Sequence, residues 1–378
     1  MKKLSLSLLE KNIDKIAAYD LENNKVFGSA YLVYQKGNLC LEKCYGTRTL
    51  SGEEKINRHT LFRLASMTKP ITAVAILILY EKGLISLDDP ITKYLPVFSD
   101  VHIINDKGID LGAPKKLPVI KNLLTHSSGI GSDMTKFSAM TKDDLSTIDA
   151  TLRYLSRTGL DFEPESTQSY SPLGAFDAAA KIIENVSGKD YFSFLKDELF
   201  IPLEMHDTTF IPTSEQRGRM VEMHQKTDEK NDVKQMPDNS IFEDIPETHF
   251  LGGGGLASTL HDYGIFAHML LEKGLSPTGK RILSENVFNN MTKNYIDICG
   301  NQAWGLGVRV ITKRSYPALP VGTFGWSGAY GTHFFVDIKN EIFAVYMKNS
   351  AFDGGAGNES AVNFEKAIYR KSLTIHRL

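Results

Sequence analysis

Strand-like segments lie at both ends of this sequence, whereas helix-like segments occupy its middle. This order indicates one sheet built from the two ends of the chain, with the middle inserted into it. The length of 378 residues allows two domains or one large core that carries an insertion. We therefore predict an α+β fold, an α/β sandwich in which helices flank an antiparallel sheet. Residues 1–85 and 246–378 would form the sheet domain, and residues 86–245 a mainly helical inserted domain.

The predicted sheet begins with a hairpin. Residues 30–35 and 39–45 are rich in aromatic and β-branched side chains and flank Lys36-Gly37-Asn38, which is a turn signature. An amphipathic helix precedes this hairpin. Residues 213–247 are polar with little periodicity, which indicates a long loop or flap. Periodicity predicts helices at 120–124, 142–157, 173–186, 191–199, 260–272 and 359–372, and strands at 305–311, 331–337 and 342–348.

Composition argues against several classes of function. A net charge of -2 offers no basic excess to attract nucleic acid. The longest apolar stretch, residues 73–80, is well below the roughly 18 residues that would suggest a membrane span. The start resembles a signal peptide only until Glu10 interrupts a short apolar run, so we expect a cytoplasmic location. Three cysteines without HExxH or CxxC patterns support neither a disulfide framework nor a metal site, and we expect no cofactor.

A serine and a lysine three residues apart occur twice in this chain. Ser66-Met67-Thr68-Lys69 and Ser193-Phe194-Leu195-Lys196 both match S-x-x-K, in which the two side chains share one helix face. At that spacing the amine can take the hydroxyl proton. The second pair lies in an amphipathic helix beside acidic residues, so its lysine is expected to be a solvated surface charge. Spacing alone therefore does not identify a reactive pair.

Ser66 stands at the start of a helix that is apolar nearly all round. The helical pattern runs from Ser66 to Lys82 and ends at Gly83, and Pro70 is tolerated only because it falls in the first turn. The positive end of a buried helix would stabilise an alkoxide on Ser66 and disfavour a protonated Lys69. From these residues alone, an N-cap serine followed by a surface lysine remains the alternative.

Four short motifs follow one another along the chain. They are Ser66-Met67-Thr68-Lys69-Pro70-Ile71-Thr72, Leu84-Ile85-Ser86-Leu87-Asp88-Asp89-Pro90, Leu123-Leu124-Thr125-His126-Ser127-Ser128-Gly129 and Gly252-Gly253-Gly254-Gly255-Leu256. Together they resemble the serine beta-lactamase-like and penicillin-binding-protein family, which includes class C beta-lactamases, D-Ala-D-Ala peptidases and family VIII esterases. The resemblance covers about residues 25–350 and implies a beta-lactamase/transpeptidase-like fold. It also implies that Ser66 is the nucleophile and Lys69 its proton-transfer partner.

The second element of that family is Tyr-x-Asn, and Tyr170-Ser171-Pro172 matches it in part. The resemblance implies that Tyr170 is a general base or proton relay, which requires Lys69 nearby because a phenol titrates near pH ~10. A half-buried structural tyrosine is the alternative. Pro172 replaces an asparagine that, in penicillin-recognising members, holds the substrate amide, and this argues against efficient beta-lactam turnover.

The third family element is Lys/His-Thr/Ser-Gly on a strand that lines the site, and Trp326-Ser327-Gly328-Ala329 matches its position. The resemblance implies that the backbone N–H groups of Ser66 and Ala329 form the oxyanion hole and that Trp326, Ser327 and Gly328 contact the substrate. Trp326 replaces a cation that would bind a substrate carboxylate, so this element looks like that of family VIII esterases. Plain strand packing of Trp326 is the alternative.

Three other patterns suggest different chemistry. Residues 325–329 nearly match the G-x-S-x-G elbow, with Ser327 as nucleophile and His376 downstream, but no run of parallel βαβ units precedes them. Residues 252–255 loosely satisfy a dinucleotide-binding pattern, although their late position favours a tight turn against the site. His126 is a candidate general base, and a loop-fixing hydrogen bond is the favoured interpretation.

The combined prediction is a serine hydrolase that forms an acyl-enzyme on Ser66 and hydrolyses carboxylic esters or small amides. Lys69 and Tyr170 would move the proton, and water would later free the enzyme. The first alternative is a beta-lactamase or a penicillin-binding, D-Ala-D-Ala peptidase-like enzyme. The second is a non-catalytic receptor or assembly protein on the same fold. The expected partner is a small ester, amide or beta-lactam.

Overall fold

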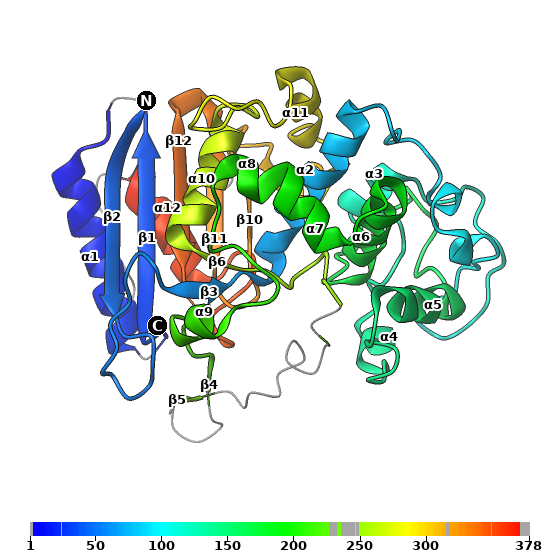
Figure 1. Cartoon of the computed structure of the whole chain (residues 1–378), viewed down its shortest axis with the longest axis horizontal. Coiled ribbons are helices and arrows are strands. Elements are labelled where there is room, and N and C mark those ends of the chain that lie inside the picture. The colour runs from blue at the N-terminus through cyan, green and yellow to red at the C-terminus, as the bar shows by residue number, and fades with distance from the viewer. Residues whose placement is uncertain are drawn as a thin grey trace.

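An antiparallel sheet lies at the centre of the fold (Figure 1). The computed structural model describes residues 3–23, 25–226, 233–235, 246, 249–314, 318–348 and 350–370. Within them the main sheet has the strand order β2-β1-β12-β11-β10-β9-β8-β7, and every neighbouring pair is antiparallel. The N-terminal hairpin pairs with the last strand, which confirms the predicted α+β fold. The strands are β1 (Gly28–Gln35), β2 (Asn38–Gly46), β7 (Ile296–Asp297), β8 (Gln302–Trp304), β9 (Arg309–Ile311), β10 (Phe324–Ser327), β11 (His333–Asp337) and β12 (Ile342–Met347).

Helices occupy both ends and most of the middle of the chain. The helices of the middle, α3 to α6, lie on the right in Figure 1, away from the β1–β2 hairpin. The division into a sheet domain and an inserted domain at the predicted boundaries stays a prediction. The helices are α1 (Leu6–Glu22), α2 (Thr68–Glu81), α3 (Ile120–Leu124), α4 (Met134–Ser138), α5 (Ile148–Thr158), α6 (Gly174–Ser187), α7 (Tyr191–Leu195), α8 (Ile201–Leu203), α9 (Ser214–Gly218), α10 (Leu260–Leu271), α11 (Glu285–Met291) and α12 (Glu359–Tyr369).

Apolar layers cover both faces of the sheet. Alternate side chains of a strand point to opposite faces, and strand β1 shows this pattern. Tyr31 and Val33 pack in one cluster with α1 and α12, whereas Ala30 and Leu32 pack in the other with α2 and α10. Burial on both faces explains why this strand is apolar along most of its length.

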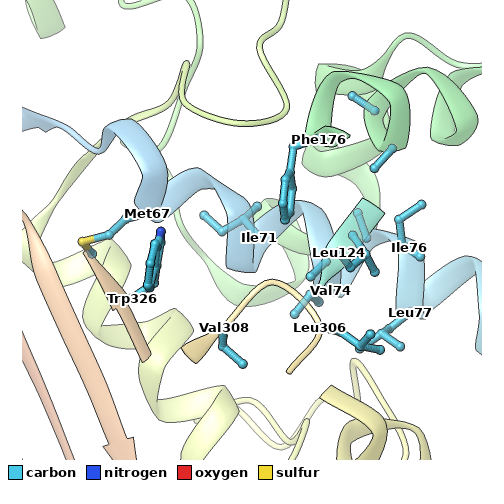
Figure 2. Packing of buried hydrophobic residues seen from close by; sticks show 14 of the residues in the cluster. Met67, Ile71, Val74, Ile76, Leu77, Leu124, Phe176, Leu306, Val308 and Trp326 are labelled. Atoms are coloured by element: carbon cyan, nitrogen blue, oxygen red, sulfur yellow. The ribbon is translucent and has the colours of Figure 1, made fainter. Parts of the chain in front are cut away.

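Helix α2 is the most deeply buried helix around the site. Every residue from Thr68 to Leu79 is buried. Figure 2 shows Ile71 and Val74 of α2 among side chains from α6 and from the turn between β8 and β9. A helix packed on all sides accounts for the nearly continuous apolar sequence, and it gives the residues at its amino end a rigid support.

Three predicted segments differ from the structure. The helix predicted at 142–157 begins only at Ile148, because the Thr147 hydroxyl caps it by accepting a hydrogen bond from the Ala150 N–H at 3.1 Å. The strand predicted at 305–311 is interrupted by a turn, in which Gly307 has a φ of 71°. The loop predicted at 213–247 contains α9 and a hairpin of β4 (His224–Lys226) and β5 (Val233–Gln235). The rest of that segment, with the possible lid, lies mostly outside the described residues.

Among the helices that the structure describes, none combines the length and the apolar character needed to cross a bilayer. The expected cytoplasmic location stays a prediction.

Candidate active site

Ser66 lies in a tight turn between strand β3 (Leu61–Arg63) and helix α2. Ala65 adopts a left-handed backbone with a φ of 45°, which is uncommon for a residue with a side chain. The preceding residue, Leu64, is fixed by a hydrogen bond of 2.8 Å from its N–H to the Leu256 carbonyl. The turn places Ser66 at the amino end of a buried helix, where unpaired N–H groups favour negative charge.

Lys69 lies one helical turn after Ser66, and its ammonium group is fully enclosed. The Nζ atom lies 3.2 Å from Ser66 Oγ and donates hydrogen bonds to the carbonyls of Pro172, at 2.6 Å, and Gly253, at 2.7 Å. Only 1% of the residue is exposed. Burial is the largest influence on this group and lowers the pKa of Lys69, while the neighbouring Tyr170 acts in the opposite direction. A lowered pKa suits a lysine that removes a proton.

Tyr170 completes the contacts of the serine. Its hydroxyl donates a hydrogen bond of 2.7 Å to Ser66 Oγ. Aromatic neighbours hold the ring: the centroid of His126 lies 4.6 Å away, that of Trp326 5.5 Å and that of Trp304 6.0 Å. The structure therefore brings the three residues predicted as catalytic into one cluster.

His126 packs against the ring of Tyr170 and binds the backbone next to it. It is buried with a φ of 55°, and its Nδ1 accepts a hydrogen bond of 3.1 Å from the Ser171 N–H. Burial and the adjacent Lys69 hold the pKa of His126 well below its usual value. A neutral ring that binds the backbone next to Tyr170 agrees with the predicted loop-fixing hydrogen bond.

The glycine run at 252–255 packs directly against Lys69. An added Cβ at Gly253 would lie 2.7 Å from the Pro172 carbonyl oxygen and 3.2 Å from Lys69 Nζ. The Gly252 N–H donates to Asp177 Oδ1 at 2.9 Å, which fixes the run from the other side. The run precedes strand β6 (Ala257–Thr259), whereas a dinucleotide-binding loop follows its strand, so that alternative is wrong.

A cavity of about 470 Å³ opens beside Ser66. Apolar and aromatic side chains dominate its walls, and no charged residue is among the described residues that line it. The ring centroids of Trp304 and Trp326, which both line the cavity, lie 4.7 Å apart in an edge-to-face arrangement. The wall nearest the chemistry includes Ser66, Tyr170, Trp304, Trp326, Ser327 and Ala329.

Gly328 does not line this cavity but sits between strand β10 and the turn that carries Ser66. An added Cβ there would lie 2.2 Å from Thr332 Oγ1 and 2.3 Å from the Leu64 carbonyl oxygen. The glycine is therefore required by close packing of two backbone segments. Its predicted contact with substrate stays a prediction.

We expect Gly328→Ala to lower the free energy of unfolding by about 1–3 kcal/mol, because backbone atoms must move to admit the methyl group. Chemical denaturation measures this change. Gly218→Ala is the matched control, since an added Cβ at that exposed position meets nothing within 4 Å. Equal stability of the two variants would contradict the packing role.

Two other sequence candidates are resolved by their surroundings. Ser327 ends strand β10 of an antiparallel sheet and no helix follows it, so the elbow interpretation is wrong. His376, its suggested partner, lies outside the described residues. In the second S-x-x-K pair, Lys196 is exposed and lies over the ring of Phe192, as expected for a surface charge.

The chain was compared with known proteins. The Beta-lactamase family profile matches residues 11–364. The chain belongs to the Beta-lactamase family. This places it among serine hydrolases of the beta-lactamase/transpeptidase-like fold, as the sequence motifs implied.

Proteins with similar sequences include one named as an esterase. Protein Rv1367c of Mycobacterium tuberculosis is 28% identical over a gapped alignment of 348 residues, and the alignment covers 85% of each chain. Esterase EstB of Burkholderia gladioli is 25% identical over a gapped alignment of 400 residues, and the alignment covers 97% of each chain. The solved structure of EstCE1, described as a hydrolase with promiscuous acyltransferase activity, covers 97% of this chain and 99% of its own at 22% identity and a TM-score of 0.83. This last likeness shows the shared fold.

Sequence reasoning missed several residues of the cavity wall. Trp304 lies on strand β8 and its Nε1 donates a hydrogen bond of 3.0 Å to Gln168 Oε1. The chain contains only two tryptophans, and both line this cavity, so the rarity of the residue was an available signal.

As for metals, the described residues contain no group of three or more His, Cys, Asp or Glu side chains arranged to hold an ion.

Proposed function

We propose that this protein hydrolyses uncharged carboxylic esters or small amides through an acyl-enzyme on Ser66. One observation carries the proposal: Ser66 Oγ lies 2.7 Å from the Tyr170 hydroxyl and 3.2 Å from Lys69 Nζ. A serine becomes a strong nucleophile only when a nearby group takes its proton. Both neighbours are within reach of that proton.

The contacts of Lys69 indicate how it takes the proton. A neutral amine has two N–H bonds and one lone pair. The carbonyls of Pro172 and Gly253 can accept both N–H bonds, which directs the lone pair toward Ser66 Oγ. In this arrangement Ser66 donates to Lys69 and accepts from Tyr170.

The reaction then proceeds in two halves. Ser66 attacks the carbonyl carbon while its proton passes to Lys69, and the backbone N–H groups of Ser66 and Ala329 stabilise the oxyanion. Tyr170 protonates the departing oxygen or nitrogen and regains a proton from Lys69. Water attacks the acyl-enzyme by the same proton path, releases the acid and restores the serine.

The cavity supports an uncharged substrate. A carboxylate would need a cation or several donors, whereas the described wall carries no charged residue and its exposed surface is mostly apolar. Trp326 stands where a cation would bind such a group, and its ring packs against Tyr170. The names of Esterase EstB and of the hydrolase EstCE1 agree with ester substrates.

Intact-mass spectrometry tests the proposal. The purified protein is incubated in parallel with short-chain p-nitrophenyl esters, a penicillin and a fluorophosphonate. We expect a fluorophosphonate adduct on Ser66 and a transient acyl adduct with the esters. A long-lived penicillin adduct without ester turnover would support a penicillin-binding protein instead. Absence of labelling by all three reagents would support a non-catalytic protein.

Tyr170→Phe is expected to lower kcat for ester hydrolysis by roughly 10²–10⁴-fold, the usual contribution of a positioned acid or base. The phenyl ring keeps the aromatic contacts and removes only the hydroxyl that reaches Ser66. Steady-state kinetics measure the loss. Tyr154→Phe, which removes a hydroxyl of helix α5 that donates to the Lys136 carbonyl of helix α4, is the control. Unchanged kcat in the Tyr170 variant would limit this tyrosine to a structural role.

A further inference from the structure

A chain of buried polar side chains leads from the cavity wall through the sheet to helix α12. Ser327 on β10 lies opposite His333 on β11, and Ser327 Oγ is 2.8 Å from His333 Nδ1. The other ring nitrogen, Nε2, is 3.3 Å from Oε1 of Glu365, and the same oxygen is 3.2 Å from Arg309 Nη2. Ser327, His333 and Glu365 are each no more than 2% exposed. Nothing in the reaction outlined above uses this chain.

The position of the carboxylate sets the direction of the hydrogen bonds. The contact between His333 and Glu365 is close but falls short of hydrogen-bond geometry, so the carboxylate acts on the ring through its charge. A neutral imidazole has one N–H, and negative charge beside Nε2 favours the proton there. With the proton on Nε2, Nδ1 is an acceptor and the Ser327 hydroxyl, 2.8 Å away, donates to it.

We infer that Ser327 offers the substrate only an acceptor, and that the site therefore selects neutral esters or amides that carry a hydroxyl or N–H group near the scissile bond. Ser327 lines the cavity two residues before Ala329, but its proton points away toward His333. A substrate hydroxyl can donate to the remaining lone pairs of Ser327, whereas these lone pairs would repel a negatively charged carboxylate. This inference rests on the proposed function and refines its substrate class.

The residues around Ser327 also offer no unpaired positive charge to a substrate carboxylate among those described above. Arg309 lies on the adjacent strand β9, opposite Gly325, and its ion pair with Glu365 compensates the charge of that carboxylate. Trp326, the preceding residue of strand β10, lines the same cavity and contributes an indole where a carboxylate would need a cation. His333 and Glu365 are thus positioning residues, which act through Ser327.

Three butyrate esters test the inference. The leaving groups are 3-(hydroxymethyl)phenol, 3-methylphenol and 3-carboxyphenol, which differ in one substituent and have similar acidity. All three form the same butyryl-enzyme, so kcat/KM reports recognition of the leaving group and the common deacylation rate does not depend on it. We expect kcat/KM for the hydroxymethyl ester to exceed that of the methyl ester by roughly 3–10-fold, the effect of one hydrogen bond. The carboxylate ester should be the poorest by roughly 10-fold or more relative to the hydroxymethyl ester.

Variants test whether the preference for the hydroxymethyl ester depends on Ser327, His333 and Glu365. Ser327→Ala should reduce the ratio between the hydroxymethyl and methyl esters to about 1, whereas Ser327→Thr keeps the hydroxyl and should retain it. Glu365→Gln removes the charge that orients His333, so the carboxylate ester should improve relative to the others. Ser29→Ala is the matched control, because Ser29 is a buried serine on strand β1 of the same sheet. Deacylation of the butyryl-enzyme should be unchanged in Ser29→Ala, and chemical denaturation identifies any variant that has lost its fold.

The outcomes separate the inference from the proposed function. Preference of the wild-type protein for the carboxylate ester would overturn the inference, because Ser327 would then be donating. A hydroxymethyl preference that survives in Ser327→Ala would overturn it as well. Both results leave the serine hydrolase intact, whereas failure of all three esters to acylate Ser66 would contradict the proposed function itself. The wild-type comparison requires no variant to fold.

Discussion

Ser66→Ala is expected to lower kcat for ester hydrolysis by roughly 10³-fold or more, since removal of the nucleophile of a serine hydrolase has effects of that size or greater. The loss should appear without a loss of fold. Ser66 is partly buried in a turn that backbone contacts hold in place, such as the hydrogen bond from the Leu64 N–H to the Leu256 carbonyl. Alanine keeps those contacts.

Ester turnover and fluorophosphonate labelling together measure this effect. Ser193→Ala is the matched control, because Ser193 has the same spacing to a lysine but lies on helix α7 with Lys196 exposed. The control should keep full activity and full labelling. If Ser66→Ala hydrolysed esters at the wild-type rate, another nucleophile would have to exist.

Lys69→Arg is expected to lower kcat/KM by roughly 10²–10⁴-fold, because a guanidinium stays protonated and cannot take the serine proton. In the wild-type protein, burial lowers the pKa of Lys69, so the neutral amine is available at a lower pH than for an exposed lysine. Activity should therefore fall as the pH falls through this lowered pKa, where Lys69 gains a proton. Above that pKa the activity should reach a plateau.

A profile of kcat/KM against pH with an uncharged ester measures this fall in activity at low pH, the acid limb of the profile. Tyr170→Phe should keep a limb of the same sign at a lower rate, since Lys69 is still present. Lys196→Arg, at the exposed lysine of the second pair, should leave the profile unchanged. Activity of Lys69→Arg within a few-fold of wild type would show that a different group removes the proton.

The sequence by itself determined the α+β fold class and singled out Ser66 and Lys69 as the candidate reacting pair. Periodicity reports which faces of a segment are buried, so the hairpin at 30–45 and the apolar helix after Ser66 were predicted close to their observed bounds. The second pair at Ser193 could be set aside because its helix is amphipathic. Local capping was less visible: Thr147 starts helix α5 later than the periodic pattern suggested.

Only the tertiary structure decided what surrounds the reacting pair. Pro172 looked like a lost donor in the sequence, yet its carbonyl holds Lys69 together with that of Gly253. Backbone carbonyls carry no sequence signal, since any residue supplies one. Trp304 likewise reaches the cavity from a strand far along the chain.

The same limit applies to the buried chain behind the cavity. Ser327 and His333 are six positions apart in sequence, and their contact depends on the register of β10 against β11. Glu365 joins them only because helix α12 packs on that face of the sheet. Sequence patterns report burial and local geometry, whereas contacts between distant segments depend on register and packing, which the whole fold sets.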